Sequence, residues 1–397
     1  MVSDQLTASN IKKRILPLIV FSQFCCTSLW FAGNGIMIDL ITDFNLSQSS
    51  LGHLTSAVQL GFILGTLTFA ILTVSDRFSP SKVFFASAVL GALFNLSMLF
   101  DFNNFISLMS FRVLTGFFLA GIYPVGMKIS ADYYDKGLGK ALGFLVGALV
   151  LGTAFPHILR GYLYTFSWHY VIIVTSILAI TGGLVMIFLV PDGPYRKQSM
   201  TLDVSAFSKV FKNSSFRAAA FGYFGHMWEL YAFWAFVPVM LKYYTVLHPE
   251  SQLNIPILSF FIIAIGGLSC VVGGYISQYI GAKKTAYTAL LLSCLCCLVS
   301  PLMFEVNSIP GFISFLLFWG IVVIADSPMF STLVAQNADA KIKGTALTIV
   351  NCIGFTITII SIQILNTIYN LANTNYMYLL LAIGPILGLV ALSKKKS

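Results

Sequence analysis

Several ionisable residues lie inside apolar stretches that are long enough to form membrane-spanning helices, and the main candidates among them are Arg112, His226, Glu229 and Asp326. A charged side chain at the centre of a bilayer costs at least about 2.5–3.5 kcal/mol, so each residue needs a partner, a hydrated cavity or a function. Burial without a fixed cation favours the protonated form of a carboxyl group. We therefore interpret Glu229 as a proton-coupling candidate, together with Asp326 or His226.

Both carboxyl groups also have a structural interpretation, which stays open at this point. Glu229 lies near the middle of an apolar run over residues 216–247, where a buried carboxyl can form a hydrogen bond to a neighbouring helix. Asp326 comes two residues before Pro328, which frees a backbone carbonyl and loosens the helix. Such an acid can serve a transport site, cap the broken backbone or contact a cytoplasmic gate.

Arg112 is the main cation within these apolar runs. Arginine keeps its charge in nearly every environment and binds carboxylate or phosphate groups through two hydrogen bonds. Tyr123 follows eleven residues later and returns to nearly the same helix face, so the two side chains can line a cavity and bind an anionic group. The alternative is a permanent ion pair, for which Asp39 is the candidate partner.

Neutral polar and aromatic side chains form a second group of candidates. Trp30 and Asn34 share a face of the first apolar run, and polar stripes on the second and eleventh runs contain Gln59 and Asn351. Such stripes either line water or hold helices together. With the charged residues, they give a predicted substrate-binding set of Trp30, Asn34, Gln59, Arg112, Tyr123, Glu229, Trp234 and Asn351.

The composition shows what kind of elements must position these residues. The chain is 57% hydrophobic and 9% charged, with a mean hydropathy of +0.87. These values exclude a soluble, disordered, disulfide-rich or nucleic-acid-binding protein and indicate an all-α membrane protein. Twelve runs can each cross a bilayer: 15–41, 51–74, 81–101, 105–134, 137–163, 168–190, 216–247, 254–280, 283–304, 310–336, 341–368 and 374–393.

The sequence carries no pattern typical of an enzyme that acts in the membrane. The seven cysteines lie inside apolar runs, where they are expected to pack as small hydrophobic side chains and not to bind metal. His226 and Glu229 are three residues apart, but there is no His-Glu-x-x-His motif and no phosphate-binding loop. We expect no metal, no cofactor and no enzymatic activity.

Basic residues predict the orientation of the chain. Nineteen of the 23 Lys and Arg residues fall at one set of helix ends, and only Arg160 and Lys242 fall at the opposite ends. This asymmetry places both termini in the cytoplasm, at the cytoplasmic (inner) membrane of a cell. An even number of crossings is then required.

One long connection divides the twelve runs into six and six. It covers residues 191–215, between predicted bundles at 1–190 and 216–397. The two parts contain similar segments at nearly constant offsets. Ser75–Lys82 aligns with Ser277–Lys284 at an offset of 202 residues, and Gly139–Leu142 aligns with Gly344–Leu347 at an offset of 205 residues. Near-constant offsets are typical of a duplicated six-helix unit, although short apolar segments can also match by chance.

Two motifs resemble those of the major facilitator superfamily of secondary transporters, and the similarity covers essentially the whole chain. Asp76, Arg77 and Lys82 match the signature between the second and third helices, although Leu72 and Ser79 stand where glycines are usual. Arg112 and Gly116 match a signature early in the fourth helix. The resemblance implies two pseudo-symmetric six-helix bundles that move about a central site. It also implies a coupling-linked role for Arg112.

Together these observations predict a secondary active transporter that moves a small solute, of anionic character, by alternating access and with coupled protons. We expect Asp76 and Arg77 to form charge pairs that hold a gate shut. The expected partners are the solute, protons and the lipid bilayer, with no nucleic acid, and the protein is expected to be monomeric. The alternatives are a drug or metabolite exporter, an intramembrane enzyme or a transporter-like receptor, and the direction of transport is left open.

Overall fold

The structure, a computed structural model, describes residues 2–134, 138–196, 210–339, 343–372 and 374–393. Side chains are described from Arg14 onward within these ranges, except at 138–140. Within these ranges the chain forms helices and no strand, which confirms the predicted all-α fold. Eleven helical spans are long and apolar enough to cross a membrane, and Arg14–Thr27 is a shorter apolar helix. Together they account for the twelve predicted crossings.

The first six crossings include two interrupted helices. α1 (Val2–Thr27) is followed by the short helices α2 (Ala32–Gly35) and α3 (Met37–Asp43). The remaining elements are α4 (Ser50–Ile71), α5 (Val74–Arg77), α6 (Pro80–Leu96), η1 (Ser97–Leu99), α7 (Phe105–Leu119), α8 (Tyr123–Tyr133), α9 (Leu138–Tyr162) and α10 (His169–Leu189). α7 and α8 form one crossing with a break between them.

The last six crossings begin with α12, which is continuous over 34 residues. Here α15 and α16 form one crossing with a break at Asp326, and η2 and α18 form the last. Their bounds are α12 (Ser214–Leu247), α13 (Ile255–Ile280), α14 (Ala282–Phe304), α15 (Ile309–Ala325), α16 (Ser327–Asn337), α17 (Lys343–Ala372), η2 (Asn375–Ala382) and α18 (Ile383–Ser393).

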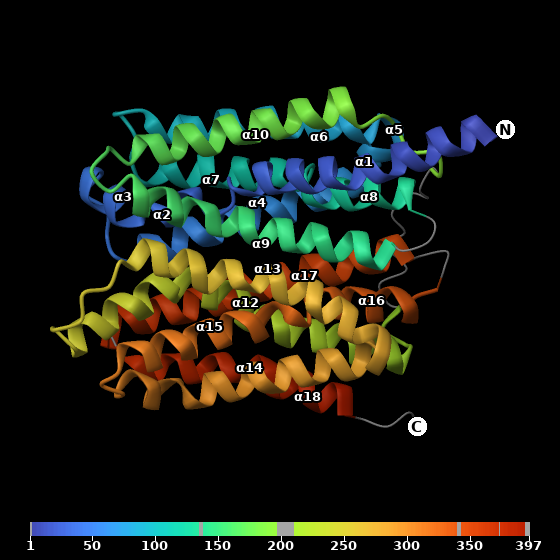
Figure 1. Ribbon diagram of the computed structural model, residues 1–397. Helices are drawn as coiled ribbons and strands as arrows, with labels where there is room; N and C mark the ends of the chain where they lie inside the picture. The colour runs from blue at the N-terminus through green and yellow to red at the C-terminus, as the bar shows by residue number, and fades with distance from the viewer. Residues whose placement is uncertain (1, 135–137, 197–209, 340–342, 373, 394–397) are drawn as a thin grey trace.

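Figure 1 shows α1–α10 on one side of the molecule and α12–α18 on the other, and we call these the first and second halves. α1 begins and α18 ends at the same end of the molecule, which we call the terminal end; the opposite one is the far end. The halves pack together mainly through two helix pairs, α9 with α13 and α4 with α17.

The contact between the halves is close at the middle and at the far end. The backbones of α9 and α13 approach at Gly147 and Gly267, where an added Cβ would lie 3.1 Å from the facing carbonyl oxygen. On α17, Gln363 donates hydrogen bonds to the Gly52 carbonyl oxygen (3.0 Å) and to Ser56 Oγ (2.8 Å) of α4. Toward the terminal end, a Cβ added at Gly143 would meet no atom within 4 Å. The face of α9 that packs closely at Gly147 is therefore open one turn earlier, at Gly143.

The two interrupted crossings α7–α8 and α15–α16 have the same design. α8 and α16 each have 11 residues, and both begin with proline in their first turn. Proline lacks a backbone N–H, so it fits the first turn of a restarted helix better than its interior. α16 begins 204 residues after α8 begins, and it ends 204 residues after α8 ends. This spacing agrees with the offsets found in the sequence.

The glycine contact between α4 and α7 gives a stability prediction. A Cβ added at Gly61 would lie 1.9 Å from the backbone carbonyl oxygen of Val113, which cannot move away easily. Gly61→Ala should therefore lower the melting temperature of the detergent-solubilised protein by several degrees, since overpacking costs about 1–3 kcal/mol.

The matched control is Gly274→Ala on α13, where the new methyl group would meet no atom within 4 Å. This control should keep or raise the melting temperature, because alanine is a better helix former than glycine by about 1 kcal/mol. Equal shifts for the two variants would contradict the close packing of α4 against α7.

Candidate functional site

A cavity of about 470 Å³ lies between the halves at the far end, and we call it the far-end pocket. Both halves contribute to its wall. The helices α2, α3 and α9 of the first half and α12 of the second provide the lining residues Asn34, Asp39, His157, Arg160 and Lys242. Gln48 and Asn254 also line the pocket.

Four aromatic rings pack against one another between the halves below this pocket, and we call them the aromatic plug. Trp30 and Phe62 come from the first half, and Tyr231 and Phe355 from the second. The ring centroids of Trp30 and Tyr231 are 5.8 Å apart, and those of Phe62 and Phe355 are 4.5 Å apart. Ala235, which lines the far-end pocket, lies one helical turn beyond Tyr231. The plug therefore lies next to the floor of that pocket.

Two further cavities lie on the other side of the plug. A central pocket of about 40 Å³ is lined by Tyr231 and Phe355 of the plug and by Tyr123, Tyr223 and Asn351. An inner pocket of about 280 Å³ lies between α8, α9, α13 and α16, and shares Tyr123, Met127, Val146 and Ser331 with the central one. The cavities therefore form a path that the plug interrupts.

The predicted neutral binding residues lie in or close to this path. Asn34 lines the far-end pocket and donates a 2.7 Å hydrogen bond to Thr55 Oγ1. Trp234 packs against Tyr231 at a centroid distance of 5.2 Å. The indole N–H groups of Trp30 and Trp234 and the amide of Gln59 are buried and have no hydrogen-bond partner. Buried polar groups are normally paired, so these atoms are available to a bound molecule or water.

Arg112 does not line any of these three pockets. Its side chain is 1% exposed and donates hydrogen bonds to the carbonyl oxygens of Leu29 (3.1 Å) and Trp30, with Asn95 Oδ1 at 3.5 Å. Leu29 and Trp30 lie in the break between α1 and α2, where carbonyl groups lack helical donors. The guanidinium group therefore completes the hydrogen bonding of a broken transmembrane helix.

The alternative interpretation of Arg112, an ion pair with Asp39, is not formed in the structure. Asp39 pairs with Arg160, whose Nη2 and Nε lie 2.8 Å and 2.9 Å from the two carboxylate oxygens. Both side chains are about one-fifth exposed and line the far-end pocket, so this pair is accessible from the far end.

Glu229 faces the interior of the second half. Its Oε1 atom accepts hydrogen bonds from Ser293 (2.5 Å) and Cys297 (3.2 Å) of α14 and from Trp319 Nε1 (2.6 Å) of α15. The side chain is 1% exposed and does not line the far-end, central or inner pocket. This geometry matches the structural interpretation of Glu229, a hydrogen bond to neighbouring helices.

Asp326 is the second buried acid, and it lies next to His226. His226 Nδ1 on α12 lies 2.8 Å from Asp326 Oδ1 at the α15–α16 break, and both side chains are 1% exposed. Neither carboxylate oxygen forms a well-aligned hydrogen bond. The two groups can therefore exchange a proton or accept a water molecule. Within the described ranges, no three His, Cys, Asp or Glu side chains are placed to hold a metal ion.

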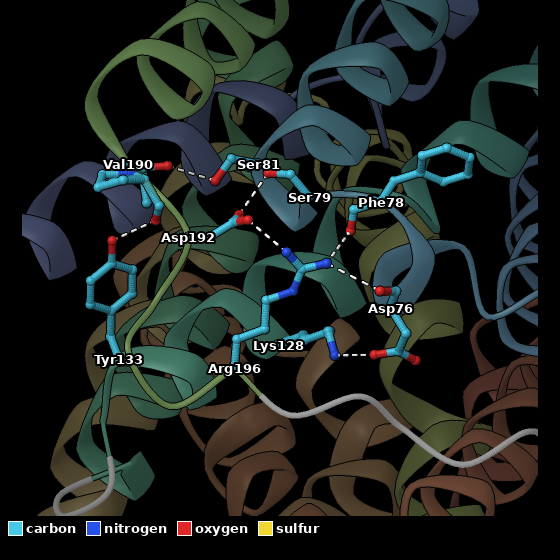
Figure 2. Close-up of polar contacts among 10 residues, drawn as sticks. Asp76, Phe78, Ser79, Ser81, Lys128, Tyr133, Val190, Asp192 and Arg196 are labelled. Carbon is cyan, nitrogen blue, oxygen red and sulfur yellow. Dashed lines mark hydrogen bonds and ion pairs between the residues drawn. The ribbon is translucent and has the colours of Figure 1, made fainter.

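A charge network holds the loop around Asp76 at the terminal end (Figure 2). Asp76 pairs with Lys128 of α8. Arg196 pairs with Asp192 at 2.6 Å and donates to the carbonyl oxygens of Asp76 (3.1 Å) and Phe78 (2.8 Å). Arg77, predicted to share in the gate, is exposed and donates to Thr73 Oγ1 in its own turn (3.1 Å).

Several residues of the path and the network were not predicted as site residues from the sequence. Asp192 and Arg196 stand in the Pro-Asp-Gly-Pro-Tyr-Arg segment, where two opposite charges next to a helix end could have indicated a paired cap. Arg160 was known only as one of two basic residues at the far end. Nothing in the sequence distinguishes Tyr231 and Phe355 as residues of the path, because the apolar runs contain many aromatic residues.

Comparison with known proteins gives a family and a fold. Residues 19–362 match the family described as Major Facilitator Superfamily. The MFS proton:xylose symporter XylE, bound to 6-bromo-6-deoxy-D-glucose, is 13% identical, with a TM-score of 0.74 over 96% of this chain and 95% of that chain. A bacterial homologue of the human lysosomal transporter Spinster, inward-facing and unoccupied, is 14% identical, with a TM-score of 0.68 over the same shares. No curated protein matches the sequence.

The position of Arg112 predicts a structural role that can be tested without a substrate. Arg112→Ala would leave the buried carbonyl groups of Leu29 and Trp30 without their donor, at about 1–3 kcal/mol for each group. We expect a large fall in melting temperature in detergent. The control Arg77→Ala removes an exposed guanidinium group and should change the melting temperature little. Similar values for both variants would contradict this role.

Proposed function

The chain belongs to the Major Facilitator Superfamily, and on this basis we propose that it is a secondary active transporter that moves a small solute by alternating access. The main support is the aromatic plug, because each half contributes two of its rings and it separates a far-end pocket from an inner one. A change in the angle between the halves would open the path to one end and close it to the other.

The moving bodies in this proposal are residues 1–190 and 216–397, joined by the 191–215 connection. The equal 204-residue spacing of the interrupted crossings supports this division. The asymmetry of basic residues supports a position in the cytoplasmic membrane, with the terminal end in the cytoplasm. The inner pocket would then lead to the cytoplasm and the far-end pocket to the outside.

Proton coupling is the energy source that we propose. Protonation of Glu229 converts one of its oxygens from an acceptor to a donor, and it would weaken the bonds from Ser293, Cys297 and Trp319. These bonds fasten α12 to α14 and α15. Protonation would therefore loosen α12, which also carries Tyr231 of the plug and His226 beside Asp326.

The solute contacts the residues that line the path. Trp30, Asn34, Tyr123, Trp234 and Asn351 lie on or beside it and supply aromatic faces and amides. Arg112 does not support an anionic solute, because its guanidinium group is committed to backbone carbonyls. The aromatic lining also favours the second candidate function, export of a bulkier amphipathic compound.

The role of Glu229 can be tested in proteoliposomes, with a solute chosen because it raises the melting temperature in a metabolite panel measured at two pH values. Glu229→Gln mimics the protonated acid and should abolish uptake driven by a pH gradient while exchange of the solute continues. The control Glu305→Gln changes an exposed acid at the end of α14 and should leave both activities intact.

Unchanged gradient-driven uptake by Glu229→Gln would exclude this acid as the coupling group. If wild-type proteoliposomes exchange none of the stabilising solutes, the transporter proposal itself fails.

The charge network at the terminal end is the proposed gate. Asp76→Asn removes the ion pair with Lys128 and should make the inner pocket more accessible, so a cysteine placed at Thr332 in that pocket should react severalfold faster with a water-soluble thiol reagent. Arg77→Gln serves as the control, because the hydrogen bond of Arg77 among the described residues is to Thr73 in its own turn. A reaction rate that Asp76→Asn leaves unchanged would show that this pair does not restrict the pocket.

A further inference from the structure

The far-end pocket contains a distribution of charge that the proposed function does not explain. Arg160 and Lys242, the only basic residues predicted for the far helix ends, both line this one cavity. They come from opposite halves, Arg160 from α9 and Lys242 from α12. Each half thus contributes one cation to the lining of this pocket between the halves.

The charges of the pocket do not cancel. Its charged lining residues are Asp39, Arg160 and Lys242, which gives a formal charge of −1 + 1 + 1 = +1. Asp39 and Arg160 neutralise each other through two hydrogen bonds. Lys242 is exposed, and no ion pair is found for it among the described residues. The excess positive charge therefore belongs to the wall formed by the second half.

A buried imidazole adds a polar contact on the other wall of the pocket, which the first half forms. His157 is 2% exposed, lines the pocket and has no hydrogen-bond partner at Nε2. A neutral imidazole can donate from that atom. Much of the remaining lining is aliphatic, from residues such as Ile38, Leu51 and Val239. The pocket thus offers an apolar body with a few convergent polar groups, as small-molecule sites do.

We propose that the far-end pocket is the entry site for a small organic anion with an apolar body, whose carboxylate binds between Arg160 and Lys242. The inference rests on the proposed function, in which a solute enters or leaves at this end. Closing the far end brings Lys242 toward the Arg160–Asp39 pair, and the uncompensated charge of Lys242 is then stabilised where an anion lies beside it. A bound carboxylate would therefore allow the halves to close over it, whereas a cation would not.

The test measures the local charge with thiol reagents and needs no knowledge of the solute. Val239→Cys places a thiol in the pocket, and Tyr162→Cys places one on the exposed end of α9 outside it. The full chain is studied in nanodiscs of phosphatidylcholine, which has no net charge, so an anionic lipid headgroup cannot fill the site. Sulfonate, trimethylammonium and hydroxyethyl methanethiosulfonates supply the anionic, cationic and neutral probes, and the unsubstituted protein gives the background.

The ratio of anionic to cationic labelling rates should be higher at Val239→Cys than at Tyr162→Cys. Adding Lys242→Gln should lower the ratio at the pocket severalfold, and adding Asp39→Asn should raise it, because Arg160 then loses its counter-charge. The neutral reagent should react at nearly the same rate in all pocket variants. If Asp39→Asn changes the labelling rate of the neutral reagent, that variant alters access to the thiol as well as charge. The comparison then rests on Lys242→Gln.

Equal ratios at the two positions, or a ratio that Lys242→Gln does not change, would overturn the proposal. A second measurement uses hexanoate and its uncharged analogue hexanamide as competitors. Hexanoate should slow neutral labelling at Val239→Cys more than hexanamide does, and equal protection by both would also overturn it. Neither measurement records transport, so failure of the proposed function would be recognised separately, as absent exchange in proteoliposomes.

Discussion

The architecture depends on the hydrogen bonds between the guanidinium group of Arg112 and the broken backbone that follows α1. Inside a bilayer no water is available to satisfy free carbonyl groups, so a transmembrane helix can be interrupted only where the protein supplies donors. The break carries Trp30, whose ring joins the aromatic plug. A single buried cation on α7 therefore fixes the position of a central element of the path without touching the path itself.

In the second half, the candidate proton-coupling carboxyl group does not lie on the proposed solute path. On α12, Glu229 and Tyr231 are two residues apart and so point to nearly opposite sides of the helix. Tyr231 meets the first half at the plug, whereas Glu229 is bound by α14 and α15. An effect of protonation would have to reach the solute through movement of α12, because the carboxyl group does not line the pockets.

Hydropathy alone predicted the crossings well: the run 216–247 corresponds to Ser214–Leu247, and 254–280 to Ile255–Ile280. The loosening of the helix near Asp326 was also expected, because Pro328 cannot continue a helix ladder. The partner of Arg112 was not predictable, since residue spacing gives the face of a helix but not which neighbour it meets. Backbone carbonyls carry no sequence signal, and the cation that pairs with Asp39 was 121 residues away.

The two halves differ in the continuity of their first crossing. The first crossing of the first half is jointed at residues 28–31, whereas the corresponding first crossing of the second half, α12, is one uninterrupted rod of 34 residues. In the proposed movement between the halves, α12 would carry its displacement along one continuous helix. The first crossing would carry it across a break that the guanidinium group of Arg112 holds together.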